Sequence, residues 1–451
     1  MKVLRQNRYH VKKTNPDYDL LLHHMRDSKA VYNFANYLVR QRYFRRIGRN
    51  FNERFLDEFA DDATLHAEIQ AYLDGSKMFS SLLKRIVCAV ARRFCCRINA
   101  KAVQNVVDKL HADWAAFFEL IKRKKDGSYN ERVNPPRYKK EAFNLVEYNP
   151  QVVSKVKLAD GFVGTAKMVQ GIRLRRLRPN ETVQSFRVYW ENERVFLEVV
   201  LVQEIAMPKK NGWDGQKIAS VDLGVDNLMT VAFNYERRPV VISGRELKSL
   251  NRFFNKEKGK LQGKLPSGVR SSRRIRRLLG RRKDEIRNLF GRITNQFVVF
   301  LLREGVTKLI VGKAKGWKDE VNLGTVNNQN FVHIPFGVLV RILRYKCEDV
   351  GILLVMQDES YTSKASFLDG DFVPTYRKFK KDEEKPTYAF SGSRVKRGLY
   401  KTKDGGFIHA DLNGALNIMR KAGDLSPKGA SSLAYLKRYK HLFPISFECV
   451  A

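Results

Sequence analysis

Between residue 17 and about residue 125, hydrophobic side chains recur every three or four positions, which is the spacing of helices with one apolar face. The clearest segments are YDLLLHHM, AVYNFANYLV, SSLLKRIVCAVARRF and VQNVVDKLHADWAAFFELI. Ser76 and Asn99 precede the last two segments and are the predicted N-caps. The turn sequence DGSYN at residues 126–130 ends this helical region.

From residue 133 to residue 208 the spacing shifts towards two, which indicates strands. SFRVYWENERVFLEVVLV predicts a hairpin with its turn at residues 191–194, because β-branched and aromatic residues stand on both sides of that turn. A short basic strand expected at residues 2–11 could join the same sheet, in which case the helices are an insertion between its strands. NGWDG at residues 211–215 indicates a linker.

Predicted strands and helices alternate in the second half of the chain. IASVDLGVDNLMTVAF gives two strands around a tight loop, and KLIVG and ILLVMQ give two more. Helices are predicted for most of the basic stretch at residues 252–287, for ITNQFVVFLLREG, for residues 335–350 and for HADLNGALNIMRKAG. This order indicates a mixed α/β sheet.

The charge of the chain indicates what it binds. The 451 residues include 85 Lys and Arg against 47 Asp and Glu, which gives a formal net charge of +38. So many positive charges repel one another, so a polyanion should be the usual partner. Nucleic acid fits best, since each neutralised phosphate releases counterions. A membrane surface is the weaker alternative, because no stretch approaches ~18 apolar residues. Five scattered cysteines without a CxxC pair indicate reduced, mostly buried thiols of a cytoplasmic protein, and no zinc is expected.

Acids stand at the ends of predicted strands and at the start of the last helix. Asp222 follows IASV, Asp358 and Glu359 follow ILLVMQ, and Asp411 opens the last helix. Carboxylates that converge from different strands can hold two Mg²⁺ ions ~3.5–4 Å apart for phosphodiester hydrolysis. Singly, these acids have simpler explanations: a turn signal, two solvated loop acids and a helix cap. Together, in so basic a chain, they favour a nuclease site.

Four segments follow one another between Ala219 and Lys421: SVDLGVDNLMTV, QDESYTSKASFLDGDF, SGSRVKRGLYK and HADLNGALNIMRK. In these segments the chain resembles the TnpB (OrfB) family of transposon-encoded, RNA-guided DNA endonucleases, which are related to the type V CRISPR effectors. PPRYKK at residues 135–140 resembles a family segment more weakly. The implied fold is multidomain α+β, with a C-terminal RNase H-like (RuvC) α/β nuclease domain and a β-rich wedge domain that holds an inserted helical recognition domain.

The resemblance also implies domain bounds and partners. The wedge domain would cover residues 1–15 and 128–212, the recognition domain 16–127 and the nuclease domain 213–451, with a target-nucleic-acid-binding insertion, a degenerate zinc finger, at 360–405. Such a protein binds a guide (omega) RNA and cuts double-stranded target DNA beside a short motif, with Mg²⁺ or Mn²⁺. Base pairing reads most of the target. The implied location is the prokaryotic cytoplasm, in association with the nucleoid.

Two departures from the family pattern concern the site. Typical members have their second catalytic glutamate at the end of the strand that corresponds to KLIVG, where this chain has Gly312. They also have four zinc-binding cysteines where residues 360–411 contain none. The chain instead resembles a branch with the glutamate moved in front of YTSK, which implies Asp222, Glu359 and Asp411 as catalytic and metal-binding residues. Asp358 remains an alternative, because strand alternation places it on the face opposite Glu359.

Two basic segments are candidates for nucleic-acid contacts, although each could also be a solvated basic surface. SSRRIRRLLGRRKDEIRNLF suits a helix with one face packed on protein and the other on phosphates. PPRYKK suits phosphate contacts and base stacking. The candidate residues are Arg137, Tyr138, Lys139, Lys140, Arg273, Arg274, Arg276, Arg277, Arg281, Arg282 and Lys364.

Two rival functions use related scaffolds. One is a nuclease-dead, RNA-guided DNA-binding repressor, which the loss of the acid at Gly312 keeps open. The other is an RNase H-fold transposase, which would normally carry a compact DNA-binding module. The segments around YTSK and ADLNGALNI do not resemble such a module.

Overall fold

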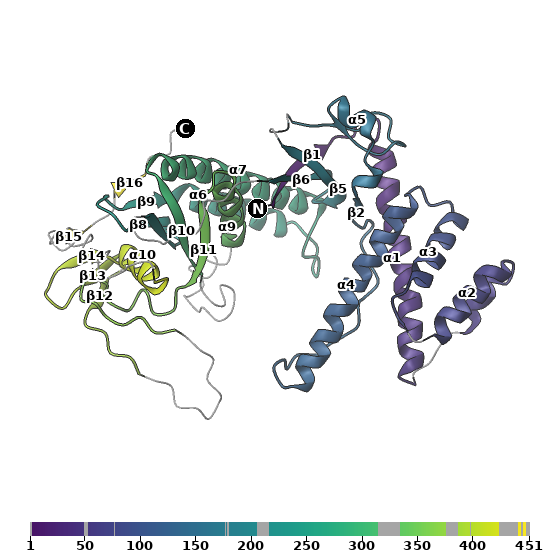
Figure 1. The fold of residues 1–451 in the computed structure, drawn as a ribbon, viewed down its shortest axis with the longest axis horizontal. Coiled ribbons are helices and arrows are strands. Elements are labelled where there is room, and N and C mark those ends of the chain that lie inside the picture. The colour runs from purple at the N-terminus through teal and green to yellow at the C-terminus, as the bar shows by residue number, and fades with distance from the viewer. Residues whose placement is uncertain are drawn as a thin grey trace. The chain divides into compact units, whose positions relative to one another are not determined.

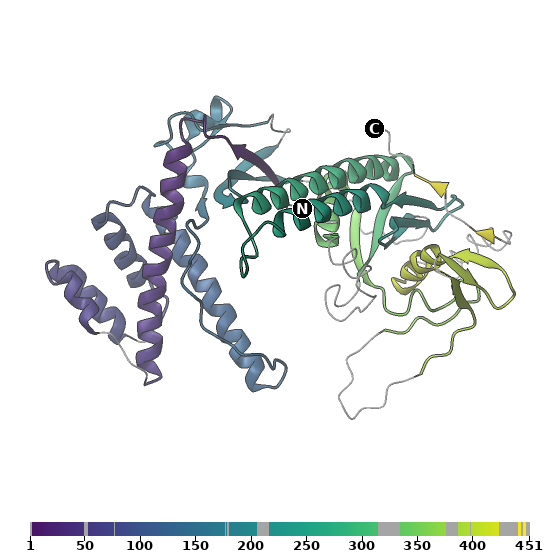
Figure 2. The same cartoon turned by 180° about the vertical axis from the view of Figure 1, so that it is seen from behind.

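The computed structural model forms two compact units, Leu4–Gln203 and Glu204–Ala451, the second joined by Met1–Val3 (Figures 1 and 2). It describes residues 2–48, 53–75, 77–175, 177, 180–204, 216–313, 334–375, 387–396, 398–423, 441–442 and 445–447. The predicted linker at residues 211–215 and Ser76 lie outside these ranges. Within them, no helix is both long and apolar enough to span a bilayer.

The first unit contains a four-stranded sheet in the order β1-β6-β5-β2. Its strands are β1 (Lys2–Val11), β2 (Val146–Tyr148), β5 (Glu181–Glu191) and β6 (Arg194–Glu204). The predicted hairpin is confirmed, and its two turn residues, Asn192 and Glu193, have positive φ values of 50° and 64°. Two consecutive positive φ angles match the twist of a tight hairpin. The N-terminal strand joins this sheet, so the helices are inserted between its strands.

Four longer helices follow β1 along the chain, and α1 and α4 lie side by side (Figure 1). They are α1 (Tyr18–Arg46), α2 (Ala63–Asp74), α3 (Ser81–Arg93) and α4 (Ala100–Lys125). Asn99 caps α4 as predicted, since its Oδ1 accepts a hydrogen bond of 2.8 Å from the Ala102 amide. The prediction for α3 is wrong, because Ser80 caps that helix. Short elements complete the unit: η1 (Glu53–Phe59), η2 (Pro150–Val152), α5 (Lys155–Ala159), β3 (Phe162–Val163) and β4 (Ile172–Arg173).

The second unit is built on a six-stranded mixed sheet in the order β11-β10-β7-β8-β9-β16, which confirms the prediction. Its strands are β7 (Lys217–Leu223), β8 (Asn227–Phe233), β9 (Val240–Ser243), β10 (Val306–Lys313), β11 (Leu353–Asp358) and β16 (Ile445–Ser446). β10 runs parallel to both β7 and β11, whereas β7, β8 and β9 are antiparallel. The carboxyl ends of β7, β10 and β11 therefore meet at one edge of the sheet.

Helices cover both faces of this sheet. Their bounds are α6 (Arg245–Gln262), α7 (Arg273–Arg303), α9 (Phe336–Asp349) and α10 (Ala410–Lys421). α7 is one continuous helix that contains both the end of the basic stretch and most of ITNQFVVFLLREG, and both were predicted to be helical. A smaller sheet lies beside α10, with β12 (Ser393–Lys396), β13 (Leu399–Lys401), β14 (Phe407–His409) and β15 (His441–Leu442).

Strand alternation in β7 sends its side chains to two different environments. Ala219 and Val221 enter the core that also contains residues of α7 and α9. Ser220 points to the opposite face, where its hydroxyl donates a hydrogen bond of 2.7 Å to the Ala415 carbonyl in α10. Asp222, two positions further, belongs to the α10 face as well.

The cysteines differ from their predicted burial. Cys347 is buried, Cys88 and Cys96 are half-buried, and Cys95 is exposed. All four are free thiols, and Cys449 lies outside the described residues.

Candidate active site

The structure brings three predicted acids together at the carboxyl ends of the parallel strands. Burial raises the pKa of the Asp222 carboxyl well above its usual range, and the negative charges of Glu359 and Asp411 raise it further. Arg394 and the Leu223 amide oppose this shift without cancelling it. A carboxyl surrounded by like charges holds its proton until a cation compensates them. The electrostatics therefore favour a cation at this cluster.

Two glycines give the carboxylates their space. A Cβ atom at Gly414 in α10 would lie 2.5 Å from Asp222 Oδ2, and one at Gly312 in β10 would lie 2.7 Å from Glu359 Oε2. Both distances are shorter than a side-chain carbon tolerates. The Glu359 carboxylate therefore lies where a side chain at position 312 would begin.

The neighbouring acid has a different environment. Lys421, at the end of α10, donates a hydrogen bond of 2.8 Å to Asp358 Oδ1. Burial alone would raise the pKa of Asp358, but hydrogen bonds from Lys421 and Ser360 outweigh burial and lower it. β11 ends at Asp358, so Glu359 is the first residue beyond the strand. The structure thus assigns Glu359 to the acid cluster and Asp358 to an ion pair with Lys421.

Asp411 lies in the first turn of α10, but it does not cap the helix. The N-cap position belongs to His409, whose side chain makes no capping hydrogen bond. Asn227 donates a hydrogen bond of 2.9 Å to Asp411 Oδ2, and an Arg394 nitrogen lies 3.9 Å from Asp411 Oδ1. The simple explanation of Asp411 as a cap is therefore wrong.

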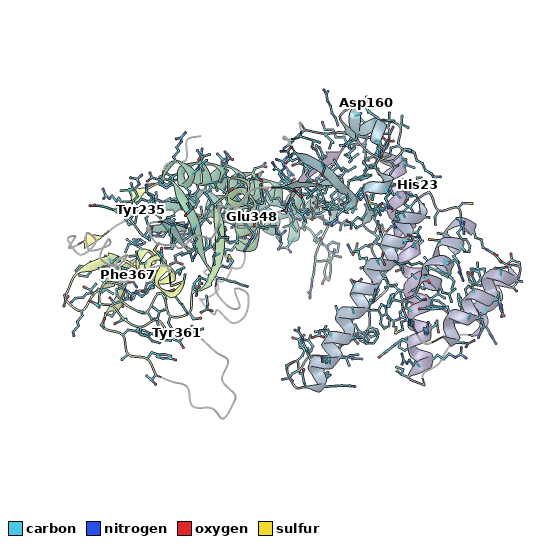
Figure 3. The ribbon with its side chains drawn as sticks, viewed as in Figure 1. His23, Asp160, Tyr235, Glu348, Tyr361 and Phe367 are labelled. Atoms are coloured by element: carbon cyan, nitrogen blue, oxygen red, sulfur yellow. The ribbon has the colours of Figure 1, made fainter. Side chains whose placement is uncertain are left out.

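Two buried asparagines of α10 hold the loop that follows Glu359. Asn413 accepts a hydrogen bond from the Phe367 amide at 2.9 Å and donates one to the Ala365 carbonyl at 2.7 Å. Asn417 donates to the Thr362 and Ala365 carbonyls at 2.9 Å and 2.7 Å. Figure 3 labels Tyr361 and Phe367 in this loop. The loop after Glu359 is thus fixed to the helix that carries Asp411.

Sequence reasoning missed the roles of these asparagines and of Asn227 and Arg394. Asn413 and Asn417 are four residues apart in an otherwise apolar stretch, so they share one face of the helix. That spacing is a signal that could have been read. Nothing in the local sequence links Asn227 or Arg394 to Asp411.

The chemistry of the cluster suits a hard cation. All three side chains offer carboxylate oxygens, which Mg²⁺ prefers over nitrogen or sulfur ligands. Among the described residues, no group of three or more His, Cys, Asp or Glu side chains is already positioned to enclose an ion. Mutual repulsion opposes a closer approach of such carboxylates in the absence of a cation.

The arginines of α7 do not all have the same surroundings. Arg273, Arg274, Arg276, Arg277 and Arg281 are exposed. Arg282 is partly buried, and its guanidinium donates hydrogen bonds of 3.0 Å and 2.7 Å to Asn251 Oδ1 in α6. Arg282 therefore joins two helices, whereas the others present their charge to solvent. Lys364, in the loop after Glu359, is also exposed.

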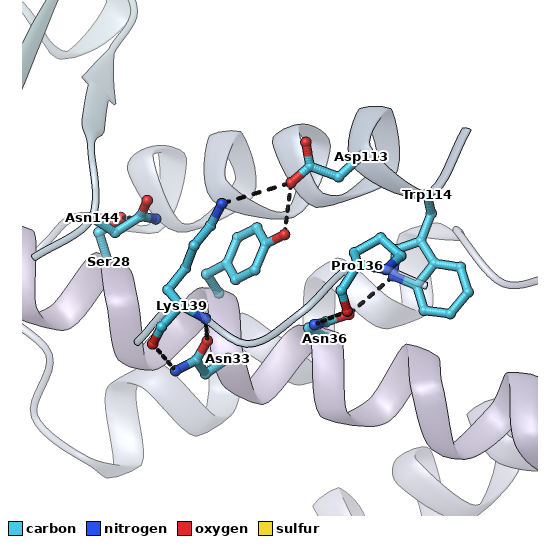
Figure 4. A network of polar contacts seen from close by, with 9 residues as sticks. Ser28, Asn33, Asn36, Asp113, Trp114, Pro136, Lys139 and Asn144 are labelled. Carbon is cyan, nitrogen blue, oxygen red and sulfur yellow. Dashed lines mark hydrogen bonds and ion pairs between the residues drawn. The ribbon is translucent and has the colours of Figure 1, made fainter. Parts of the chain in front are cut away.

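The segment at residues 135–140 runs along α1 without forming a strand (Figure 4). Asn36 and Arg40 donate hydrogen bonds to the Pro136 carbonyl at 3.1 Å and 2.7 Å, and Asn33 bonds to both backbone groups of Lys139. The Lys139 ammonium lies 4.0 Å from Asp113.

The remaining candidate side chains of this segment face outward. Arg137 and Lys140 are exposed, and Tyr138 is 41% exposed below the Arg40 guanidinium. The backbone is thus fixed while Arg137, Tyr138 and Lys140 remain accessible.

Comparisons with known proteins find similarities along most of the chain. A family model described as "Probable transposase" (OrfB_IS605) matches residues 199–318, and one described as "Cas12f1-like, TNB domain" matches residues 336–418. TnpB-like protein ORF457 of the Acidianus two-tailed virus is 23% identical over 453 residues, covering 89% of this chain and 91% of that protein.

Two solved structures are also similar in part. A Cas12f1–sgRNA–target DNA complex gives a TM-score of 0.46 at 12% identity, covering 91% of this chain and 82% of that chain. A CRISPR-Cas12f ternary complex gives a TM-score of 0.30 at 12% identity, covering 89% of this chain and 81% of that chain.

The fold and the site define a multidomain α+β protein with a carboxylate cluster at one edge of a mixed sheet. The chain is similar to a TnpB-like protein, and parts of it match the OrfB_IS605 and Cas12f1-like family models.

Proposed function

We propose that this protein is an RNA-guided DNA endonuclease that cuts double-stranded target DNA by Mg²⁺-dependent phosphodiester hydrolysis. The observation that carries the proposal is the convergence of Asp222, Glu359 and Asp411 at the carboxyl ends of parallel strands. The similarity to the OrfB_IS605 and Cas12f1-like models supports a nuclease, and in this proposal the mixed sheet with α10 across it would be a RuvC-like domain.

Each residue of the site has a role in this proposal. Asp222, Glu359 and Asp411 would hold the metal, while Asn227 and Arg394 orient the Asp411 carboxylate. When bound, Mg²⁺ supplies an activated water and stabilises the leaving oxygen. Mn²⁺, which accepts the same oxygen ligands, would substitute.

The position of Glu359 compensates for Gly312. The carboxylate occupies the space above Gly312, so a glutamate from the end of β11 takes the place that a side chain on β10 would otherwise fill. The ion pair of Asp358 with Lys421 supports the choice of Glu359 over its neighbour. A nuclease-dead repressor would not need three acids in mutual electrostatic contact.

The nucleic acids would contact both units. We assign residues 1–15 and 128–212 to a wedge domain, 16–127 to a recognition domain and 360–405 to a target-binding insertion of the nuclease domain. The exposed residues Arg137, Tyr138 and Lys140 suit the guide RNA. The exposed arginines of α7 suit the guide–target heteroduplex, which a protein grips through its backbone rather than its sequence.

Glu359→Gln tests the proposal, with Asp358→Asn as the matched control. Gln keeps the shape and one oxygen but removes the charge, so cleavage should fall by at least about a hundredfold, as when a metal ligand or its support is lost. Binding of guide RNA and target DNA should remain. Cleavage of matched DNA is measured with the copurified RNA sequenced and supplied in excess.

Other outcomes are informative. An active Glu359→Gln protein beside an inactive Asp358→Asn protein would transfer the role to Asp358. Wild-type protein that binds matched DNA and never cuts it, with guide and Mg²⁺ present, would establish the repressor instead.

A further inference from the structure

The first unit contains a pocket of about 440 Å³ at the N-terminus of α4, remote in sequence from every acid of the nuclease site. Its walls come from α1, the start of α4, the β2 strand and the loop before β4. Its hydrogen-bonding groups and charges come from His24, Arg97, Lys101, Tyr148, Thr165 and Lys167. Its volume exceeds that of a single phosphate ion.

His24 presents an unused hydrogen-bonding atom at this pocket. Its side chain is 2% exposed, and Nδ1 lies 2.5 Å from the Tyr148 hydroxyl. Burial raises the pKa of Tyr148, so the phenol keeps its proton and can donate it to Nδ1. Burial and the nearby Lys167 and Arg97 lower the pKa of His24 to about 4. The imidazole is therefore neutral, and with the Tyr148 phenol as the donor to Nδ1 its single proton is on Nε2.

Nε2 is buried and has no hydrogen-bond partner among the described residues. The Thr165 hydroxyl is likewise buried and has no hydrogen-bond partner among the described residues. Thr165 as a whole is 4% exposed. Buried polar atoms are rarely left unsatisfied in native proteins. His24 and Thr165 both line this pocket, and two residues with such atoms at one pocket indicate a missing hydrogen-bond acceptor.

The charge of the pocket identifies that acceptor. Arg97, Lys101 and Lys167 supply three cations, and the first turn of the 26-residue helix α4 adds its positive dipole end. The nearest acids are already engaged: Asp17 accepts hydrogen bonds from the amides of residues 169–171, and Asp27 accepts one from the Arg97 amide. An anion with several oxygens matches these donors.

We propose that this pocket binds the phosphoryl group of a nucleotide, either free or within an RNA chain, with His24 Nε2 and the Thr165 hydroxyl as donors. The space beyond one phosphate accommodates the attached sugar. The site goes beyond the proposed nuclease activity, because it needs neither the acid cluster nor cleavage.

Histidine NMR on the full-length protein, freed of nucleic acid at high salt, tests the proposal. The chain has 8 histidines, and the His24 signal is the one that Tyr148→Phe shifts most in the unliganded protein. Inorganic phosphate, adenosine monophosphate, adenosine and a short single-stranded RNA are added separately. The phosphate-containing probes should shift the His24 Nε2 signal, whereas adenosine should not.

Variants distinguish binding at this pocket from non-specific attraction of phosphate to a positively charged protein. Thr165→Val removes the hydroxyl at constant shape, and Lys101→Ala removes one cation. Each should weaken binding about ten- to a hundredfold, the effect of one hydrogen bond to a charged group. Lys124→Ala removes an equal charge from the exposed far end of α4 and should change affinity little.

The four probes also distinguish a phosphate of an RNA chain from that of a free nucleotide. A His24 shift with RNA as well as adenosine monophosphate assigns the pocket to the RNA backbone, and a shift with the mononucleotide alone assigns it to a free nucleotide. No shift with any probe would overturn the proposal, as would equal losses in Lys101→Ala and Lys124→Ala. None of these results depends on DNA cleavage.

Discussion

At the scale of single residues, the absence of a side chain at Gly312 leaves the space that the Glu359 carboxylate occupies. Gly312→Ala places a Cβ atom 2.7 Å from Glu359 Oε2 and 2.7 Å from Ile418 Cδ1. We expect overpacking to destabilise the protein by about 1–3 kcal/mol and cleavage to fall further than stability explains, because the displaced group is the carboxylate. Thermal unfolding and cleavage rates on the same preparations measure both effects.

Gly259→Ala is the control for this substitution. Gly259 lies inside α6. Among the described residues, no atom apart from those of its chain neighbours and the adjacent backbone of α6 lies within 4 Å of the position that its methyl group would take, so alanine should stabilise the helix by roughly 0.5–1 kcal/mol. Gly312→Ala protein that cuts DNA at the wild-type rate would show that Glu359 does not need this space.

Asp222 should make the metal-free protein less stable as the pH rises. Its pKa in the folded protein lies well above the ordinary 3.8, so the folded state holds a proton that the unfolded chain has already released. The loss of folding stability that results from this raised pKa is absent below the pKa of Asp222 in the unfolded chain. It grows as the pH rises towards the pKa of Asp222 in the folded protein. Asp222→Asn should therefore raise the melting temperature of the metal-free protein at about pH 8, and this increase should be smaller at about pH 4.

The same variant should lose the stabilisation that Mg²⁺ gives to wild type, together with cleavage. Asp404→Asn, an exposed residue in the turn after β13, is the control and should leave both properties unchanged. A melting temperature that Asp222→Asn lowers at every pH would show that the Asp222 carboxylate is stabilised rather than strained.

At the scale of elements, much of the fold could be predicted because local patterns specify it. The hairpin follows from β-branched residues around Asn192, and the cap of α4 follows from Asn99. Asp222 and Asp411 could be identified from their places at the end of a strand and the start of a helix. The resemblance favoured Glu359 over Asp358, but residue spacing alone could not make that choice, because the ion pair of Asp358 with Lys421, 63 residues away, depends on tertiary packing.

The connection between α10 and the loop after Glu359 gives a prediction at this scale. Asn417→Ala removes two hydrogen bonds to buried loop carbonyls and should cost about 1–3 kcal/mol of stability. The freed loop should position Glu359 less well, so cleavage should require more Mg²⁺. Titrations of cleavage against Mg²⁺, with RNA binding measured in parallel, check this expectation.

Asn417→Gln and Cys347→Ala serve as comparisons. Glutamine keeps the amide and should partly restore the Mg²⁺ requirement. Cys347 is buried in α9 on the other face of the sheet, so alanine should lower stability without shifting that requirement. An Asn417→Ala protein with lower stability and an unchanged Mg²⁺ requirement would make the asparagine purely structural.

At the scale of the whole molecule, the net charge of +38 predicted a polyanionic partner but could not say which basic residues bind it. Ion pairs and hydrogen bonds within the protein decide that, as Arg282 shows through its bonds to Asn251. The pocket at α4 was equally hidden, because His24, Lys101 and Thr165 come from segments far apart in the sequence. Such interactions depend on tertiary packing rather than on local pattern.

Arg274, Arg277 and Arg281 lie on one face of α7 and are exposed, which makes them the sharpest test of how the charge is used. Replacing all three with Gln should leave the melting temperature nearly unchanged. The slope of log affinity for a guide–target heteroduplex against log salt should become shallower by about 0.7–0.9 for each phosphate that the protein no longer neutralises. Arg282→Gln should do the reverse, with lower stability and an unaltered slope, because its guanidinium binds Asn251. An unaltered slope in the triple variant would mean that α7 is only a solvated basic surface and that the heteroduplex binds elsewhere.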